Sequence, residues 1–198
     1  MGTDSAIGCD RLGPDSPELK AVLASLGIEL RRVPPVHDAT GAPVSSTRIR
    51  EAIWESRLDA AAAMLGRPVS VYGTVVRGDA RGRRLGYATA NVDIAREVRP
   101  PFGVYATITC VDGKSYGSVT NVGYRPTVQT PPSGMRPDLI VESHLFDFSG
   151  DLYGKKAEIV FIAKIRDERR FPDVLTLVEQ IRKDEEKARA ILRNRGAV

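Results

Sequence analysis

The sequence predicts a mainly β domain of about six strands that ends in a helix and is preceded by a small α/β segment. From residue 69 onward, short runs rich in β-branched and aromatic residues alternate with turn residues such as Asp112-Gly113 and Ser149-Gly150. Before residue 67, the apolar residues mostly follow helical spacing instead. Short strands joined by short loops are typical of a small antiparallel barrel or sandwich.

Composition narrows the class of protein. The chain has 198 residues, of which 42% are hydrophobic and 27% charged, as in ordinary globular proteins. Its net charge of +4 suits a small anionic ligand as readily as nucleic acid. Aromatic residues make up only 6% and are not interleaved with basic ones, which argues against a nucleic-acid stacking platform. No apolar run reaches membrane-spanning length. Cys9 and Cys110 lie far apart without metal-like spacing, so we expect a cytoplasmic, reducing environment.

The N-terminal third is expected to contain helices and one strand. Pro17–Leu26 has an apolar face and Gly27 to end it, and Ile28–Val33 is predicted to be a strand. Ser45–Arg50 opens a second helix, with hydroxyl residues suited to cap it and arginines at an end that favours anions. Leu58–Leu65 forms a third helix that stops at Gly66. We place a domain boundary there, between residues 66 and 67.

The remaining chain is expected to be a β domain followed by a helix. Its predicted strands are Val69–Val76, a short one around Thr89–Val92, Gly103–Cys110, Lys114–Thr120, Asp138–Asp147 and Lys156–Lys164. A final helix starts near Pro172. Its predicted core face consists of Val174, Leu177, Val178 and Ile181, and its continuation over Arg182–Arg195 is strongly charged.

The stretch Gly78–Gly86 and the two polar residues that follow it are the first candidate site. Glycines let a backbone approach a ligand closely, and the arginines between them suit phosphate oxygens. Thr89 and Asn91 supply hard oxygen ligands of the kind Mg²⁺ accepts, and residues two apart on a strand point the same way. Taken by itself, the stretch also fits a basic glycine-rich turn between two strands.

Glu142 is the second candidate. It shares one side of a predicted strand with His144, and a carboxylate in a partly apolar strand could act as a general base. An exposed glutamate on a solvated sheet face is the alternative. The run Asn121–Thr127 fits a strand that enters a rigid turn.

Together these segments resemble the riboflavin kinase family, in particular the kinase module of the bacterial bifunctional riboflavin kinase/FAD synthetase. The resemblance extends from about Ser45 to Ala188. It rests on an ordered series of short motifs, which are Ser45–Arg50, Leu65-Gly66-Arg67-Pro68, Gly73-Thr74-Val75, Gly82-Arg83-x-Leu85-Gly86, Thr89-Ala90-Asn91, Gly103-Val104-Tyr105, Asn121-Val122-Gly123, Arg125-Pro126-Thr127, Glu142-x-His144, Asp151–Gly154 and Arg166-Asp167-Glu168.

The resemblance implies a six-stranded antiparallel Greek-key barrel over residues 67–198 that makes FMN and ADP from riboflavin and ATP. It implies Glu142 as the catalytic base and Mg²⁺ held by Thr89 and Asn91. The implied nucleotide-binding residues are Gly78, Arg81, Gly82, Arg83, Leu85, Gly86, Thr89 and Asn91. The implied flavin-binding residues are Arg125, Thr127, Arg166 and Phe171.

Two departures from the family pattern stand out. Ala88 replaces a proline before Thr89, which is expected to loosen the loop without removing either metal ligand. Residues 1–66 resemble only a truncated remnant of an FMN adenylyltransferase, with linker helices, and His37 and His144 are the only histidines in the sequence. The resemblance therefore implies no FAD synthetase activity. Apolar surface on this remnant could support self-association.

Two other functions stay open at this point. The truncation of the adenylyltransferase-like segment and the presence of Ala88 are also compatible with a non-catalytic module that binds flavin or nucleotide for regulation. Nucleic-acid binding through the basic stretches is a third, weaker reading, so the partners that we expect are riboflavin, FMN, ATP and ADP, without nucleic acid or membrane.

Overall fold

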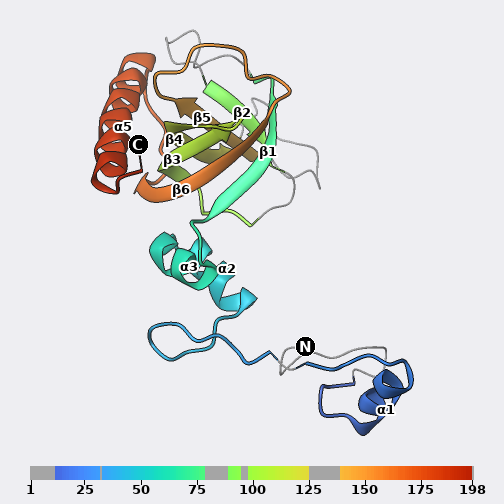
Figure 1. The fold of residues 1–198 in the computed structure, drawn as a ribbon. Helices are drawn as coiled ribbons and strands as arrows, with labels where there is room; N and C mark the ends of the chain where they lie inside the picture. The colour runs from blue at the N-terminus through green and yellow to red at the C-terminus, as the bar shows by residue number, and fades with distance from the viewer. Residues whose placement is uncertain (1–11, 32, 79–88, 95–97, 125–138, 198) are drawn as a thin grey trace, which may run out of the picture. The chain divides into compact units, whose positions relative to one another are not determined.

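The computed structural model describes residues 12–31, 33–78, 89–94, 98–124 and 139–197. The chain divides into two compact units, Met1–Ser46 and Thr47–Val198 (Figure 1). Within the described ranges, no helix is both long enough and apolar enough to cross a membrane.

The first unit contains one helix, α1 (Pro17–Ser25), among its described residues. The Ser16 hydroxyl caps it by accepting a hydrogen bond from the Leu19 N–H at 3.2 Å, and Pro17 occupies the first turn. Gly27, with φ of 66°, follows its end, in agreement with the sequence. The strand predicted at Ile28–Val33 is wrong, because residues 28–31 and 33 are not in strand conformation. A β-rich composition makes a strand only where a partner strand pairs with it.

The second unit begins with two helices, α2 (Ser46–Trp54) and α3 (Leu58–Leu65). Gly66 ends α3 in the left-handed conformation expected at a helix C-terminus. Buried residues of both helices belong to the same apolar cluster as the interior of the β domain, namely Ala52, Ile53, Leu58 and Ala61. The compact units therefore divide at Ser46/Thr47 rather than after residue 66, where the sequence analysis placed the boundary.

Six antiparallel strands close into a barrel in the order β1-β2-β5-β4-β3-β6 (Figure 1). Their bounds are β1 Ser70–Val76, β2 Thr89–Asp93, β3 Gly103–Val111, β4 Lys114–Tyr124, β5 Leu139–Leu145 and β6 Lys156–Arg166. Strands β3, β4 and β5 pair in sequence, and β6 returns to pair with β3, which is the Greek-key arrangement. The predicted barrel is thereby confirmed.

Buried hydroxyl groups interrupt the apolar interior of the barrel. One part of the interior is apolar, with Tyr105 and Phe161 packed edge to face at 5.3 Å between ring centroids. The other part is a cluster of five side chains that are at most 1% exposed: Thr107 and Thr109 on β3, Ser118 and Thr120 on β4, and Ser143 on β5.

These five hydroxyls form a closed ring of hydrogen bonds, which we call the hydroxyl ring. Its five contacts measure 2.7–3.0 Å and run Thr107–Ser118–Thr109–Ser143–Thr120 and back to Thr107. In the contact between Thr120 and Ser143, the Thr120 hydroxyl is the donor. In each of the other four contacts of the ring, either hydroxyl can donate. A single direction around the ring therefore lets every hydroxyl donate once and accept once.

The C-terminal helix α5 (Val174–Asn194) covers the outside of the barrel at β3, β4 and β6 (Figure 1). Asp173 caps it by accepting from the Thr176 N–H at 2.7 Å. Its buried residues are Asp184, Ala188 and Leu192. The predicted core face was therefore wrong in position. Val174 is 58% exposed and its predicted companions Leu177, Val178 and Ile181 are only half-buried, because the helix meets the barrel through its charged second half.

Candidate active site

The candidate site lies on the outer face of the barrel where β2, β5 and β4 are neighbours. Alternate residues of these strands face opposite ways. Ala90 and Val92 of β2 and Val141 of β5 are buried in the interior cluster. Thr89, Asn91 and Glu142, which alternate with them, are half-buried on the outer side. These three side chains are thus partly exposed on one common surface.

Strand register brings the three residues together. Asn91 is paired with Glu142 across β2 and β5. The Thr89 hydroxyl donates a hydrogen bond to Oε1 of Glu142. Residues 89 and 91 are separated from residue 142 by some fifty positions of chain, so only the barrel places them in one site. Glu142 thus lies beside Thr89 and Asn91 rather than apart from them.

Asn121 is a further member of the site that the sequence analysis did not single out as a site residue. It is paired with Glu142 across β4 and β5, on the side of Glu142 opposite to Asn91. Glu142 therefore stands between two asparagine side chains on one face. The motif Asn121-Val122-Gly123 was visible in the sequence, but its meaning depends on the register of β4 against β5, which no local pattern supplies.

Gly78 fits closely against Asn91. A Cβ built on Gly78 would lie 2.1 Å from Nδ2 and 2.5 Å from Cγ of Asn91, far inside contact distance. Glycine here therefore lets the backbone after β1 pass the asparagine side chain without displacing it. The other predicted nucleotide-binding residues Arg81, Gly82, Arg83, Leu85 and Gly86 lie outside the described residues, as does Ala88.

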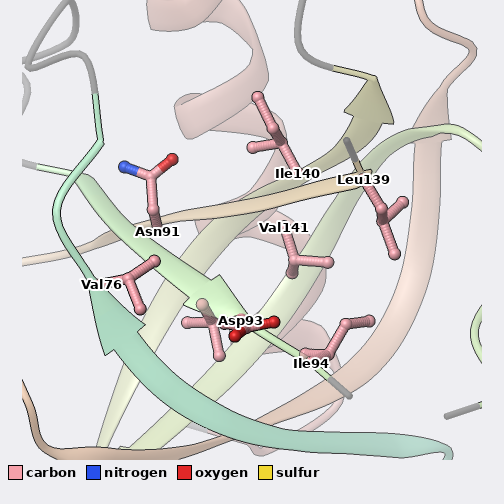
Figure 2. Close-up of a pocket in the computed structure, with 8 residues that line it drawn as sticks. Val76, Asn91, Asp93, Ile94, Leu139, Ile140 and Val141 are labelled. Carbon is pink, nitrogen blue, oxygen red and sulfur yellow. The ribbon is translucent and has the colours of Figure 1, made fainter. Parts of the chain in front are cut away.

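A pocket of about 310 Å³ opens beside Asn91 (Figure 2). Figure 2 shows Asn91 and Asp93 from β2, Val76 from the end of β1, and Ile140 and Val141 from β5 around it. Its full lining is Val76, Asn91, Val92, Asp93, Ile94, Leu139, Ile140 and Val141. The polar groups of Asn91 and Asp93 thus lie beside apolar side chains, a combination typical of small-molecule sites.

A scan of known families matches the riboflavin kinase (flavokinase) model to residues 65–192, which is more than half of the chain. The chain belongs to the riboflavin kinase family. The match covers all six strands of the barrel and nearly all of α5.

Curated relatives agree with this assignment. The bifunctional riboflavin kinase/FMN adenylyltransferase of Pseudomonas fluorescens is 37% identical over 191 residues, which are 96% of this chain and 59% of the relative. The enzyme of the same name from Escherichia coli K12 is 42% identical over 150 residues, which are 75% of this chain and 46% of the relative. The chain thus spans about half the length of the curated relatives it matches.

A solved structure shares the fold over nearly the whole chain. It is titled a macrolide-efflux protein from Streptococcus pneumoniae, has a TM-score of 0.76 and is 34% identical. The match covers 95% of this chain and 58% of that one.

Two flavin-binding predictions of the riboflavin kinase resemblance fall on the end of β6 and the connection to α5. The Arg166 guanidinium forms a salt bridge with the buried Asp184 carboxylate at 2.7 Å and lies over the Phe171 ring at 5.6 Å from its centroid. Arg169 lies over the same ring at 4.8 Å. The ion pair ties β6 to α5, and a flavin contact by Arg166 or Phe171 stays a prediction. Arg125 and Thr127 lie outside the described residues.

The donor atoms of the site suit a magnesium ion. No cluster of three His, Cys, Asp or Glu capable of holding a metal occurs in the described ranges, so a metal here would use other oxygens. Thr89 offers a hydroxyl oxygen and Asn91 an amide oxygen, both hard ligands. Because the Thr89 hydroxyl gives its hydrogen to Glu142, the lone pairs of its oxygen stay available for a cation.

Proposed function

We propose that the chain is a riboflavin kinase that transfers the γ-phosphoryl group of ATP to the ribityl 5′-hydroxyl of riboflavin, giving FMN and ADP. The observation that carries this proposal is the convergence of Thr89, Asn91 and Glu142 on one outer face of the barrel. Phosphoryl transfer requires a positioned acceptor, neutralised phosphate charge and an oriented nucleophile, and these three side chains are suited to supply them.

In the proposed mechanism, Glu142 accepts the proton of the riboflavin 5′-hydroxyl while the oxygen of that hydroxyl bonds to the γ-phosphorus. The bond from that phosphorus to the β,γ-bridging oxygen breaks, and its electrons leave with ADP. The Thr89 hydroxyl, which donates to Oε1, fixes the orientation of the Glu142 carboxylate and leaves Oε2 for the substrate. A bound Mg²⁺, held by Thr89 and Asn91, would neutralise charge on the phosphates.

We assign the nucleotide to the side of β1 and β2, and the flavin to the side of β4 and the β6–α5 connection. Gly78 supports the first assignment, since its close approach to Asn91 brings the start of the Gly-Arg stretch against a proposed metal ligand. The pocket beside Asn91 lies on the same side. The group of Phe171, Arg166 and Arg169 supports the second assignment, because flavin rings stack on aromatic rings and on planar guanidinium groups.

The test is FMN formation from riboflavin and Mg-ATP by the wild type and by Glu142→Gln. Loss of a positioned base lowers rates by about 10²–10⁴-fold, so we expect kcat to fall that far while flavin and nucleotide binding remain. Glu186→Gln, at an exposed position of α5, is the matched control and should keep the wild-type rate. Tight flavin binding without turnover by the wild type would instead support a non-catalytic binding module.

We also propose that a polypeptide of residues 1–198 makes no FAD. Its two histidines, His37 and His144, are too far apart in sequence to form the His-x-x-His-type motif of the adenylyltransferase. FAD formed from FMN and ATP by the purified polypeptide would refute this part of the proposal without affecting the kinase assignment.

A further inference from the structure

The Glu168 carboxylate lies over the backbone of Gly123, on the barrel face that carries Glu142. A Cβ built on Gly123 would be 2.3 Å from Oε1 and 3.2 Å from Oε2 of Glu168. A side chain at residue 123 would push this carboxylate aside. Gly123 follows Asn121 by two residues on β4, and alternate residues of a strand share a face. Glu168 therefore occupies the outward position next to the paired Asn121 and Glu142.

Several charged residues near Glu168 are engaged by other protein groups. Lys164 pairs with Asp167 at 2.6 Å, and Arg166 pairs with Asp184 at 2.7 Å. Among the described residues, the exposed Glu168 carboxylate has no hydrogen-bond or ion-pair partner. The carboxylate beside Gly123 thus has oxygens that can accept hydrogen bonds from a ligand.

The strand positions beside the two carboxylates are spaced like the hydroxyls of a short polyhydroxylated chain, since Asn121 pairs with Glu142 and Gly123 lies against Glu168. Two residues of a strand span about 6.6 Å, which separates Gly123 from Asn121 along β4. Carbon–carbon bonds of about 1.5 Å place hydroxyls three carbons apart in an extended chain at roughly 5–6 Å. If Glu142 meets one end of such a segment, Glu168 is placed to meet the other.

Building on the proposed function, we propose that Glu168 is a specificity residue for the acceptor. Its carboxylate accepts a hydrogen bond from the ribityl 2′-hydroxyl while Glu142 receives the proton of the 5′-hydroxyl. No bond to Glu168 forms or breaks. The pair of carboxylates thereby selects a ring-linked chain with hydroxyls at both positions, and Gly123 leaves the room that the second carboxylate occupies.

The test compares riboflavin with 2′-deoxyriboflavin as substrates for the wild type, Glu168→Gln and Glu168→Ala. Hydrogen bonds to charged groups are strong enough that losing one weakens binding about tenfold or more. We expect Glu168→Ala to raise KM and Kd for riboflavin by at least about that factor, with kcat and the KM for ATP within about twofold of wild type. The wild type should show the same loss on 2′-deoxyriboflavin, and Glu168→Ala should bind both flavins equally. Glu186→Gln is the charge control.

The outcomes separate this inference from the kinase proposal. Unchanged riboflavin affinity in Glu168→Ala, or equal losses on both flavins, would overturn the role of Glu168 while leaving FMN formation by the wild type intact. A wild type that forms no FMN would overturn the kinase proposal, and the role of Glu168 with it. Glu168→Gln keeps the shape of the side chain, so a change in affinity in this variant reports the lost charge rather than lost packing.

Discussion

At the scale of single residues, the contact between Thr89 and Glu142 joins two proposed functions. The same hydroxyl donates to the proposed base and offers its oxygen to the proposed metal. A side chain that keeps the hydroxyl should preserve both functions, and one that replaces it with a methyl group should lose both.

We therefore expect Thr89→Val to lower kcat by about 10²-fold, as for loss of an oriented base, and to raise the Mg²⁺ concentration needed for half-maximal activity about tenfold. Thr89→Ser should stay within about threefold of wild type, since it retains the hydroxyl. Steady-state kinetics over a Mg²⁺ titration measure both quantities. Equal defects in the two variants would show that the hydroxyl alone does not account for the role of Thr89.

Gly78 acts through Asn91. Gly78→Ala would place its Cβ within 2.1 Å of the Asn91 amide and must displace it. We expect the KM for Mg-ATP to rise about tenfold, comparable to other losses of a metal-positioning partner, with the KM for riboflavin unchanged. The double variant Gly78→Ala/Asn91→Ala should be no worse than Asn91→Ala alone. Additive losses in the double variant would place the effect of Gly78 elsewhere.

At the scale of elements, the hydroxyl ring connects β3, β4 and β5 beneath the candidate site. Ser143 is the member of the ring that lies on β5, and Glu142 lies on the opposite face of the same strand. The ring therefore constrains the position of β5 against β3, with which β5 does not pair directly.

Breaking the ring should be costly, because the hydroxyls left behind remain buried. We expect Thr109→Val to lower the free energy of unfolding by about 1–3 kcal/mol, the cost of leaving buried donors or acceptors unsatisfied. Adding Ser143→Ala should cost less than the sum of the single changes, since the two residues share one hydrogen bond. Urea denaturation measures these differences. Ser149→Ala, at an exposed position, is the control and should stay within about 0.5 kcal/mol.

A salt bridge links the ends of two helices. Arg195, after α5, pairs with Asp59 of α3 at 2.6 Å, and the hydrogen bond from its guanidinium lowers the pKa of Asp59. A carboxyl with a lowered folded-state pKa stabilises the fold above its unfolded pKa and loses this contribution as the pH falls through the folded value. The stabilisation therefore belongs to neutral pH and disappears in acid.

Because the pair is largely exposed, we expect Asp59→Asn to lower stability by only about 0.2–1 kcal/mol at pH 7. The difference from wild type should shrink as the pH falls through the lowered folded-state pKa of Asp59, and vanish once the carboxyl is protonated in both states. Chemical denaturation across this pH range, with Arg195→Gln measured in parallel, checks the prediction. A difference that persists in acid would point to packing rather than charge.

The elements also show what the sequence could and could not predict. Five β-rich runs and the short Thr89–Val92 strand were readable because their residues suit a pleated surface and turn residues separate them. The strand expected at Ile28–Val33 was wrong because composition cannot supply a pairing partner. The core face of α5 was misplaced because Asp184, in the charged half of the helix, is buried against Arg166, and polarity hides such a position from a hydrophobic pattern.

The sequence likewise predicted the residues of the candidate site better than their arrangement. Thr89, Asn91 and Glu142 were identified from residue chemistry and from resemblance to the riboflavin kinases. Their proximity, the place of Asn121 and the fit of Glu168 on Gly123 depend on strand register and on where a chain segment crosses a sheet. Those are long-range properties, which local spacing does not encode.

At the scale of the whole molecule, the two compact units have unequal cores. Among the described residues of Met1–Ser46, the buried apolar side chains of the core include just Leu19, whereas the second unit contains two apolar clusters. We expect a polypeptide of residues 47–198 to fold alone and to keep kcat and KM for riboflavin within about threefold of the full chain. Circular dichroism and FMN formation measure this. Loss of cooperative unfolding would show that the first unit contributes to the core.

The exposed apolar side chains are also distributed unequally between the two compact units. Val22, Leu26, Ile28, Val33 and Val36 of the first unit are all more than half exposed. We expect the full chain to self-associate as its concentration rises, and residues 47–198 to do so less, because apolar surface of this kind favours contact with another molecule. Sedimentation velocity over a concentration series compares the two. Monomers of both polypeptides throughout would refute the expectation.

Hydrogen exchange at the five ring hydroxyls would report on opening motions of the barrel. Each of their hydrogens is enclosed by protein and committed to a neighbour, so it can be traded for deuterium only when the strands part and admit solvent. Hydroxyl hydrogens on surfaces are lost to water too quickly for magnetic resonance to register them, whereas these five should give persistent signals. Their decay in heavy water would then time how often the cylinder opens beneath the proposed catalytic glutamate.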